Sequence, residues 1–354
     1  MNHFARAEQL LSQYPGLPNF RVDQINRALF DVTINSWDAI SVLPKDMRAW
    51  LNQNIPWTTL QPVTTLVSKQ GDTHKAIVQL ADGKRIETVL MRNKREAWTI
   101  CASSQVGCAM GCVFCATGKM GLVRSLTVDE IVDQYRFWQT YLASRPHITG
   151  RISNIVMMGM GEPLANYNNL KPALLIWLRY TDLGPTRITV STVGVLPLLE
   201  KTLTDPEWPA VRIAISLHSA IPEKRKQIVP TTAPQFFEKI IDWGQRYQKK
   251  YGNRRHHVTF EYIMIGGVND GTEDAKRLAQ FAKKIGRVKV NLIPYNWVDD
   301  TGLQRSTPEA IHAFLEILHG AGIIATRRKT MGDDIAAACG QLITQMKTAT
   351  KTEK

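Results

Sequence analysis

Strand-like and helix-like segments alternate along this chain from about residue 98 onward. Short apolar segments rich in β-branched residues occupy 154–159, 187–191, 211–216, 257–264, 287–294 and 323–327. Amphipathic segments with apolar residues at helical spacing lie between them, at 126–142, 234–251 and 271–286. This alternation is typical of a parallel sheet or barrel built from βα units. The sequence therefore predicts an α/β fold over about residues 98–342.

Polar or glycine-rich loops directly follow four of these strand-like segments. Their sequences are GMGEP, STVG, SLHS and PYN, beginning at residues 159, 191, 216 and 294. In parallel α/β folds, ligands bind at the carboxyl ends of the strands. We therefore expect these loops to meet around a binding site.

The first hundred residues follow a different pattern. Residues 1–60 look helical, with Val22, Ile25, Leu29 and Phe30 at helical spacing. Residues 61–97 contain short β-rich segments, two of them joined by the hairpin-like turn ADGK at 81–84. The sequence predicts a helical accessory domain (1–60), a small antiparallel β extension (61–97), the barrel (98–342) and a frayed polar tail (343–354).

The net charge of the chain limits the classes of molecule that it is expected to bind. The chain has 44 Lys and Arg against 31 Asp and Glu, a formal net charge of +13. Such an excess suits a nucleic acid, although other anions would also fit it. No apolar stretch is long enough to span a membrane, and the start lacks a secretory signal. We therefore expect a cytoplasmic protein that does not bind membranes.

Four of the five cysteines fall within fifteen residues. The five are Cys101, Cys108, Cys112, Cys115 and Cys339. Secreted disulfide scaffolds are short and dense in cysteine, and this chain is neither. Clustered cysteines in a cytosolic protein indicate metal or redox chemistry.

Cys108, Cys112 and Cys115 form the pattern C-x3-C-x2-C. Three neighbouring thiolates suit three irons of a [4Fe–4S] cluster, which leaves the fourth iron open to a substrate. A zinc site is the alternative, and its fourth ligand would be Cys101, Cys339 or a distant histidine. Cys339 taken alone would be interpreted as a small buried apolar residue.

Several longer segments of the sequence together resemble one known protein family. The cysteine pattern, with Phe114 before its last member, is similar to the signature of radical S-adenosylmethionine (SAM) enzymes. The segments CASSQVGCAMGCVFCATGKMG, LTVDEI, MGMGEPLAN, STVG, SLH and GDDIAAACGQL together resemble the RlmN/Cfr family of RNA methyltransferases. The resemblance covers nearly the whole chain. It implies a partial (βα)6 radical SAM barrel preceded by a small helical and β accessory domain.

The resemblance also implies cofactors and their ligands. Cys108, Cys112 and Cys115 would hold a [4Fe–4S] cluster, and two molecules of SAM would be used per turnover. The residues that match the family's SAM-binding positions are Gly161, Glu162, Ser191, Ser216, Leu217, His218 and Asn296. Glycines alone are a weak signal, and His218 alone would be interpreted as a structural histidine.

Three residues match the family's catalytic positions. Cys339 would accept a methyl group from SAM and pass it on to the base as a radical. Cys101 would release the product by forming a transient disulfide with Cys339. Glu87 would take the proton from adenine. Without the resemblance, Glu87 would be interpreted as an exposed carboxylate in a strand.

The implied reaction is methylation of C2 of adenine 2503 in 23S rRNA, with tRNA as a further candidate substrate. Methylation of C8 of the same adenine, the antibiotic-resistance activity of the Cfr branch, is the rival within the family. Another radical SAM enzyme class, a non-catalytic iron–sulfur RNA-binding protein and a zinc module are the rivals outside it. The resemblance also implies a flavodoxin-like electron donor. Monomer is the default oligomeric state.

Overall fold

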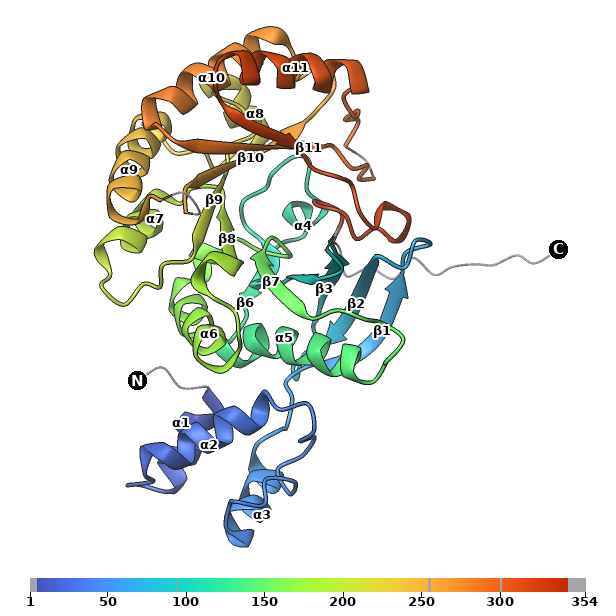
Figure 1. Ribbon diagram of the computed structural model, residues 1–354, viewed down its shortest axis with the longest axis vertical. Coiled ribbons are helices and arrows are strands. Elements are labelled where there is room, and N and C mark those ends of the chain that lie inside the picture. Colours follow the sequence, from blue (N-terminus) through green and yellow to red (C-terminus); the bar gives the residue numbers. More distant parts are fainter. Residues whose placement is uncertain (1–4, 94, 254–255, 300, 343–354) are drawn as a thin grey trace, which may run out of the picture.

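The computed structural model describes residues 5–93, 95–253, 256–299 and 301–342 (Figure 1). A curved sheet with helices on its outer side makes up most of the molecule, and three N-terminal helices lie below it in the view of Figure 1. Within the described residues, no helix is both long and apolar enough to cross a membrane.

Parallel strands form the centre of the fold. In sheet order they are β4 (Trp98–Cys101), β7 (Ile152–Met157), β8 (Ile188–Thr192), β9 (Arg212–Ser216), β10 (Val258–Met264), β11 (Val288–Pro294) and β12 (Ile324–Arg327). Each segment from β7 onward lies within two residues of the segment predicted for it. Apolar side chains on both faces are buried, as parallel strands covered by helices require. The predicted α/β barrel fold is therefore confirmed.

Helices connect successive parallel strands across the outer face (Figure 1). They are α5 (Val128–Ala143), α6 (Tyr167–Tyr180), α7 (Leu196–Thr204), α8 (Pro222–Ile228), α9 (Phe236–Tyr251), α10 (Thr272–Ile285) and α11 (Pro308–Gly320). A capping box starts α5: the Thr127 side chain accepts the Glu130 N–H, and the Glu130 carboxylate accepts the Thr127 N–H. Because a helix lies between each parallel strand and the next, the chain returns each time to the same end of the barrel before the next strand begins.

Three antiparallel strands continue the barrel sheet at one edge. They are β1 (Gln61–Val67), β2 (Thr73–Gln79) and β3 (Arg85–Arg92), with β3 antiparallel to β4. The result is a ten-stranded sheet whose outer strands are β1 and β12. The register pairs Ile77 with Glu87 and Val89 with Cys101. Because side chains alternate along a strand, Glu87 lies on the same face of β3 as Val89.

A short antiparallel pair, which the sequence did not predict, carries the cysteine motif. It consists of β5 (Gln105–Cys108) and β6 (Gly121–Ser125), and the four-residue helix α4 (Ala116–Lys119) lies between them in sequence. The pair packs at the end of β4 from which the cysteine loop leaves the barrel.

The N-terminal helices are α1 (Ala5–Gln13), α2 (Asn19–Leu29) and α3 (Lys45–Asn54). Arg136 of α5 donates to the backbone oxygen of Leu29, the last residue of α2, over 2.6 Å. Asp133 of α5 pairs with Arg136 and accepts the N–H and hydroxyl of Thr59. These buried polar contacts join the N-terminal segment to the barrel.

Candidate active site

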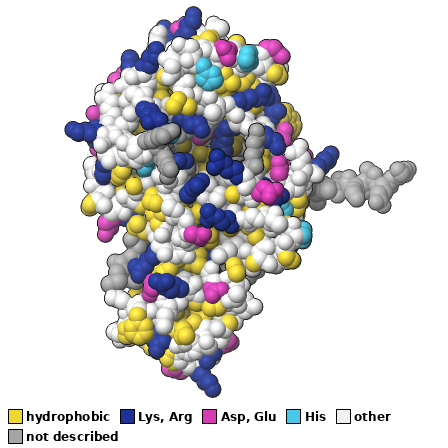
Figure 2. Space-filling model, in the orientation of Figure 1, with side chains coloured by type: hydrophobic (Ala, Val, Ile, Leu, Met, Phe, Trp, Pro, Cys, Tyr) yellow, Lys and Arg dark blue, Asp and Glu magenta, His cyan; other side chains and the backbone are white. Residues whose placement is uncertain are grey.

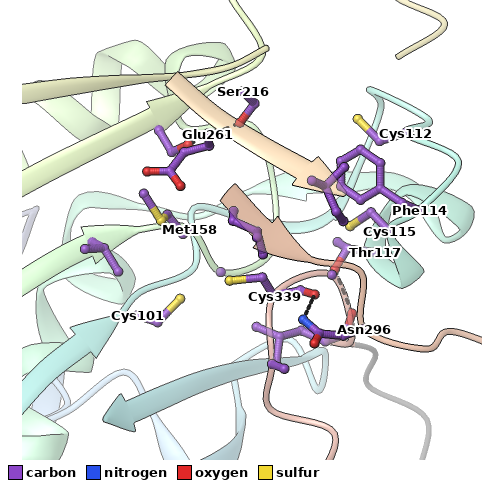
Figure 3. Close-up of a pocket in the computed structure, with 18 of the residues that line it drawn as sticks. Cys101, Cys112, Phe114, Cys115, Thr117, Met158, Ser216, Glu261, Asn296 and Cys339 are labelled. Carbon is purple, nitrogen blue, oxygen red and sulfur yellow. Dashed lines mark hydrogen bonds between the residues drawn. The ribbon is translucent and has the colours of Figure 1, made fainter. Parts of the chain in front are cut away.

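All five cysteines line one cavity at the carboxyl ends of the parallel strands (Figure 3). Cys101 is the last residue of β4 and Cys108 the last of β5. Cys112 and Cys115 follow in the loop before α4, and Cys339 comes from the C-terminal loop. The fold therefore brings a residue more than two hundred positions away to the cysteine motif.

Backbone contacts fix the loop of the cysteine motif. Val113 N–H donates to the oxygen of Ile228 over 3.1 Å, and Cys115 N–H donates to the oxygen of Cys112. Gly111 takes a left-handed φ of +62° between the first two cysteines, a conformation that glycine adopts without strain. The loop is thus held on one side by the last residue of α8.

Burial keeps the three thiols of the motif protonated when no metal is bound. Burial raises the pKa of Cys108 to about 11 and also raises the pKa values of Cys112 and Cys115. Bound metal reverses this effect, because a coordinating thiol is deprotonated outright. The donor set therefore fits an iron–sulfur cluster, which is held by thiolates. Among the described residues, no three His, Cys, Asp or Glu side chains converge as ligands of a single metal ion.

The loop that carries Cys339 is tied to the cysteine motif. Ala116 N–H donates to the oxygen of Gly340 over 2.7 Å, and the Thr117 hydroxyl donates to the oxygen of Leu342 over 2.7 Å. From the opposite side, Asn296 Nδ2 donates to the oxygen of Cys339 over 3.1 Å (Figure 3). Cys339 is therefore held between α4 and the loop that follows β11.

Cys101 and Cys339 form a pair within the cavity. Their Sγ atoms point toward one another in Figure 3. Burial, and after it the charge of Cys339, raises the pKa of Cys101 to about 12, while the nearby cation of Arg328 opposes this rise. Arg328 also lies 3.5 Å from the carboxylate of Glu261. The two cysteines outside the motif thus face one another in the same cavity.

Gly161 and Glu162 form a tight turn against Gln105, the first residue of β5. Gly161 has a φ of +99°, and a Cβ at this position would lie 2.5 Å from Cβ of Gln105. The Glu162 carboxylate accepts the N–H groups of Leu164 and Val193. Burial raises the pKa of Glu162 to about 7. A carboxyl group held in this way fits a ligand that brings a positive charge, such as the ammonium group of SAM.

Ser191, Ser216, His218 and Asn296 complete this wall of the cavity. The hydroxyls of Ser191 and Ser216 lie 3.2 Å apart. Burial lowers the pKa of His218 to about 3, so its ring is neutral, and Nδ1 accepts the N–H of Ile263. Its φ of +59° is uncommon outside glycine, and such backbone conformations concentrate at functional sites.

Two predicted residues do not line the cavity. Leu217 is fully buried beneath the strand ends. Glu87 is 1% exposed, and its carboxylate lies 3.5 Å from Nζ of Lys75. Lys75 also donates to the oxygen of Ala336 over 3.1 Å. Glu87 is therefore connected through Lys75 to the loop that carries Cys339, and it is buried where a strand carboxylate taken alone would be exposed.

Sequence reasoning missed three charged residues around the site: Lys75, Arg225 and Glu261. Each is buried. Lys75 and Glu261 stand inside strand-like segments, THKAIVQL and HVTFEYIM, where a charged residue amid apolar ones is a usable signal. No comparable signal marks Arg225, because its segment, PEKRKQI, is polar throughout.

Basic residues cluster in the sequence at 249–250, 254–255 and 327–329, where an RNA backbone could bind. Arg328 and Lys329 line the cavity, and Figure 2 shows Lys and Arg side chains around a hollow in this face of the molecule. Lys249 and Lys250 lie at the end of α9, where Lys250 binds the oxygen of Leu203. Arg254 and Arg255 lie outside the described residues.

Residues 103–282 match the model of the radical SAM superfamily. The chain is 42% identical over 336 residues to a probable dual-specificity RNA methyltransferase RlmN of Rhodopirellula baltica, covering 93% of this chain and 86% of that protein. It is 40% identical over 333 residues to the protein of that name from Thermotoga maritima, covering 92% of both. A crystal structure of a radical SAM methyltransferase from Sphaerobacter thermophilus matches with a TM-score of 0.87 and 39% identity, covering 97% of this chain and 98% of that one.

Proposed function

The chain belongs to the RlmN family of radical SAM methyltransferases, and from this premise we propose that it methylates C2 of adenine 2503 in 23S rRNA. The relatives' names describe RNA methyltransferases of dual specificity, which supports tRNA as a second substrate. The net charge of +13 and the two cations at the cavity support an RNA substrate as well. The target adenine would have to be flipped out of its stack to enter the cavity.

One observation carries the proposal: Cys101 and Cys339 lie in the same cavity as the cysteine motif. A radical SAM enzyme of another class needs the motif but has no use for two further thiols there. C2 of adenine is a poor nucleophile, so it is unsuited to attack the methyl group of SAM directly. A thiol that first takes the methyl group and then delivers it as a radical avoids this difficulty.

Cys108, Cys112 and Cys115 would hold the cluster, and Glu162 would bind the ammonium group of SAM. When bound and reduced, the cluster supplies the electron that cleaves SAM and so starts radical chemistry. Two molecules of SAM would be used, one for the methyl group and one for the radical. The electron would come from a flavodoxin-like donor. We further propose that the protein acts as a monomer in the cytoplasm.

The chain's own residues carry the methyl group. Cys339 would accept it on sulfur, give up one hydrogen atom from it to the radical derived from the second SAM, and add the resulting methylene radical to the adenine carbon. Glu87 takes the proton from that carbon. Cys101 would then attack the sulfur of Cys339, so that an S–S bond forms while the S–C bond to the base breaks. The carbon left on the base would take up a proton to become a methyl group, and the one surplus electron would be taken up by the oxidised cluster. Asn296, Ala116 and Thr117 keep Cys339 in place through their contacts with its loop.

The test is an anaerobic reaction with defined RNA. The protein is reconstituted with iron and sulfide, reduced, and supplied with SAM and a 23S rRNA fragment or tRNA, and the digested RNA is examined by mass spectrometry. 2-Methyladenosine is the expected product. 8-Methyladenosine would move the protein to the C8 branch of the family. A cluster-loaded protein that cleaves no SAM would overturn the proposal.

A further inference from the structure

Arg225 is a completely buried arginine behind the wall of the cavity. It lies in α8 and is 0% exposed. Its neighbour Lys224 pairs with the carboxylate of Asp274 over 2.8 Å. No such ion pair between Arg225 and a carboxylate occurs among the described residues.

Neutral groups hold the guanidinium of Arg225 in place. One nitrogen donates to the hydroxyl of Thr232, and another donates to the oxygens of Val193 and Ser216 over 2.7 and 3.2 Å. The group lies 3.5 Å from the centre of the Phe236 ring. Its Nε atom is buried without a hydrogen-bond partner. These contacts fix the orientation of the cation but bring no negative charge to it.

A buried cation without an anion is strongly unfavourable. Moving a charged group out of water costs several kcal/mol even after the surroundings relax, and carbonyl oxygens and a ring face offset less of this cost than an opposite charge does. Burial lowers the pKa of Arg225 to about 9, which reflects this cost. The arrangement therefore calls for an anion that the amino-acid side chains around Arg225 do not supply.

The cysteine motif lies on the side where that anion is expected. Ile228, the last residue of α8, accepts the N–H of Val113 between the second and third cysteines. Cys112 packs with Ile228 and Val229, at the end of α8, in one buried cluster. A [4Fe–4S] cluster held by three thiolates has a net charge of about −1, and of about −2 once it takes up one electron. Bound there, it would compensate the cation.

We propose that Arg225 is a fixed positive charge that stabilises the reduced cluster and so raises its reduction potential. The proposal rests on the cluster assigned to Cys108, Cys112 and Cys115, but not on the RNA substrate. Net charge and surroundings set the potential of iron–sulfur clusters, and reduction adds one negative charge that a nearby cation favours. The electron comes from a one-electron reductant, which is dithionite in the test below.

The carboxylate of SAM is a second negative group that the cavity is proposed to receive. Arg225 does not line the cavity, whereas Val193 and Ser216, whose oxygens it binds, do. The guanidinium therefore lies behind the backbone and acts on the cavity through its field. A measurement without SAM separates an effect on the cluster from an effect on the carboxylate of SAM.

The test measures the cluster potential in the full-length protein. Wild type, R225M, R225K and F236L are reconstituted anaerobically without SAM, and the reduced cluster is followed by electron paramagnetic resonance during a redox titration. R225M removes the charge, R225K keeps it, and F236L removes the ring beside it. The expected result is a lower potential for R225M, with R225K and F236L close to wild type.

Each possible result of this titration either supports the proposal or overturns it. An unchanged potential in R225M, or an equal drop in R225K, would overturn the proposal. If R225M binds no iron while R225K does, the charge is needed for the cluster itself, which supports the proposal. If neither R225M nor R225K binds iron, the lost charge does not explain the lost iron binding, and the proposal fails. The RNA reaction is measured separately, so a wild-type protein that shows this pattern but methylates no RNA would overturn only the proposed function.

Discussion

Lys75 Nζ lies 3.5 Å from Oε2 of Glu87, and the two side chains are 7% and 1% exposed. The pair joins neighbouring antiparallel strands, β2 and β3, on the face that also carries Val89 opposite Cys101. Through its contact with Ala336, Lys75 extends the link to the loop of Cys339. One buried cation thus contacts both the proposed base and the loop that carries the proposed methyl carrier.

Replacing Lys75 should destabilise the fold more than replacing both partners. K75M leaves the Glu87 carboxylate buried without its cation, which costs about 3–5 kcal/mol, whereas apolar replacement of both members of a buried pair is far less costly. Urea unfolding of wild type, K75M and the double variant K75M/E87L measures this difference. Equal free energies of unfolding for K75M and wild type would show that the Lys75–Glu87 pair does not stabilise the fold by this amount.

Gly161 and Gly71 make a matched pair for alanine substitution. Both have positive φ values, +99° and +66°, but an added Cβ meets Gln105 at 2.5 Å only at Gly161. G71A should cost about 1–2 kcal/mol from backbone strain alone. G161A should cost a further ~1–3 kcal/mol from overpacking. The free energy of unfolding of each variant checks this. Equal losses of stability in G161A and G71A would mean that the turn at Gly161 shifts to make room for the added Cβ.

The stability of the protein without cofactors should depend on pH through Glu162. Burial raises the folded-state pKa of Glu162 to about 7, above the ordinary value of 4.5. The folded protein therefore holds a proton there that the unfolded chain has already lost. This contribution is fully present below pH 4.5 and is lost as pH rises to about 7. Denaturant unfolding across pH 4.5–8 measures it, and E162Q should remove this component. An identical pH profile in E162Q would assign the effect to another group.

Replacing Cys101 should trap the RNA on the enzyme. In C101A, Cys339 still receives the methyl group and adds it to the base, but no thiol remains to break the S–C bond. A covalent complex of protein and RNA should therefore accumulate, visible as a shifted band in a denaturing gel and mapped to Cys339 by mass spectrometry. C101A that releases methylated RNA at the wild-type rate would exclude this role.

The barrel was predictable because its strands are buried on both faces and so appear as short apolar segments, such as VRIAIS before Ser216. The β5–β6 pair was not, since QVGC and GLVRS are too short and too mixed in composition to show a strand period. The hairpin of β2 and β3 was indicated by the turn around Gly83, which has a φ of +79°.

The site residues were predictable only through complete motifs. Cys339 stands in an alanine-rich segment that by itself favours a buried apolar role, and only the fold shows that it meets Cys101. Glu87 alternates with apolar neighbours, which indicates an exposed carboxylate, whereas the fold buries it beside Lys75. Such pairings depend on contacts between distant segments, so no local pattern records them.

The most direct test of the account compares wild type with C339A in the same anaerobic reaction. The account predicts that both variants cleave SAM, since Cys108, Cys112 and Cys115 are intact in each. Wild type should yield 2-methyladenosine in the digested RNA, whereas C339A should yield no methylated adenine. Methyladenosine formed by C339A at a rate near that of wild type would contradict the account, because the methyl group would then reach the base without this thiol.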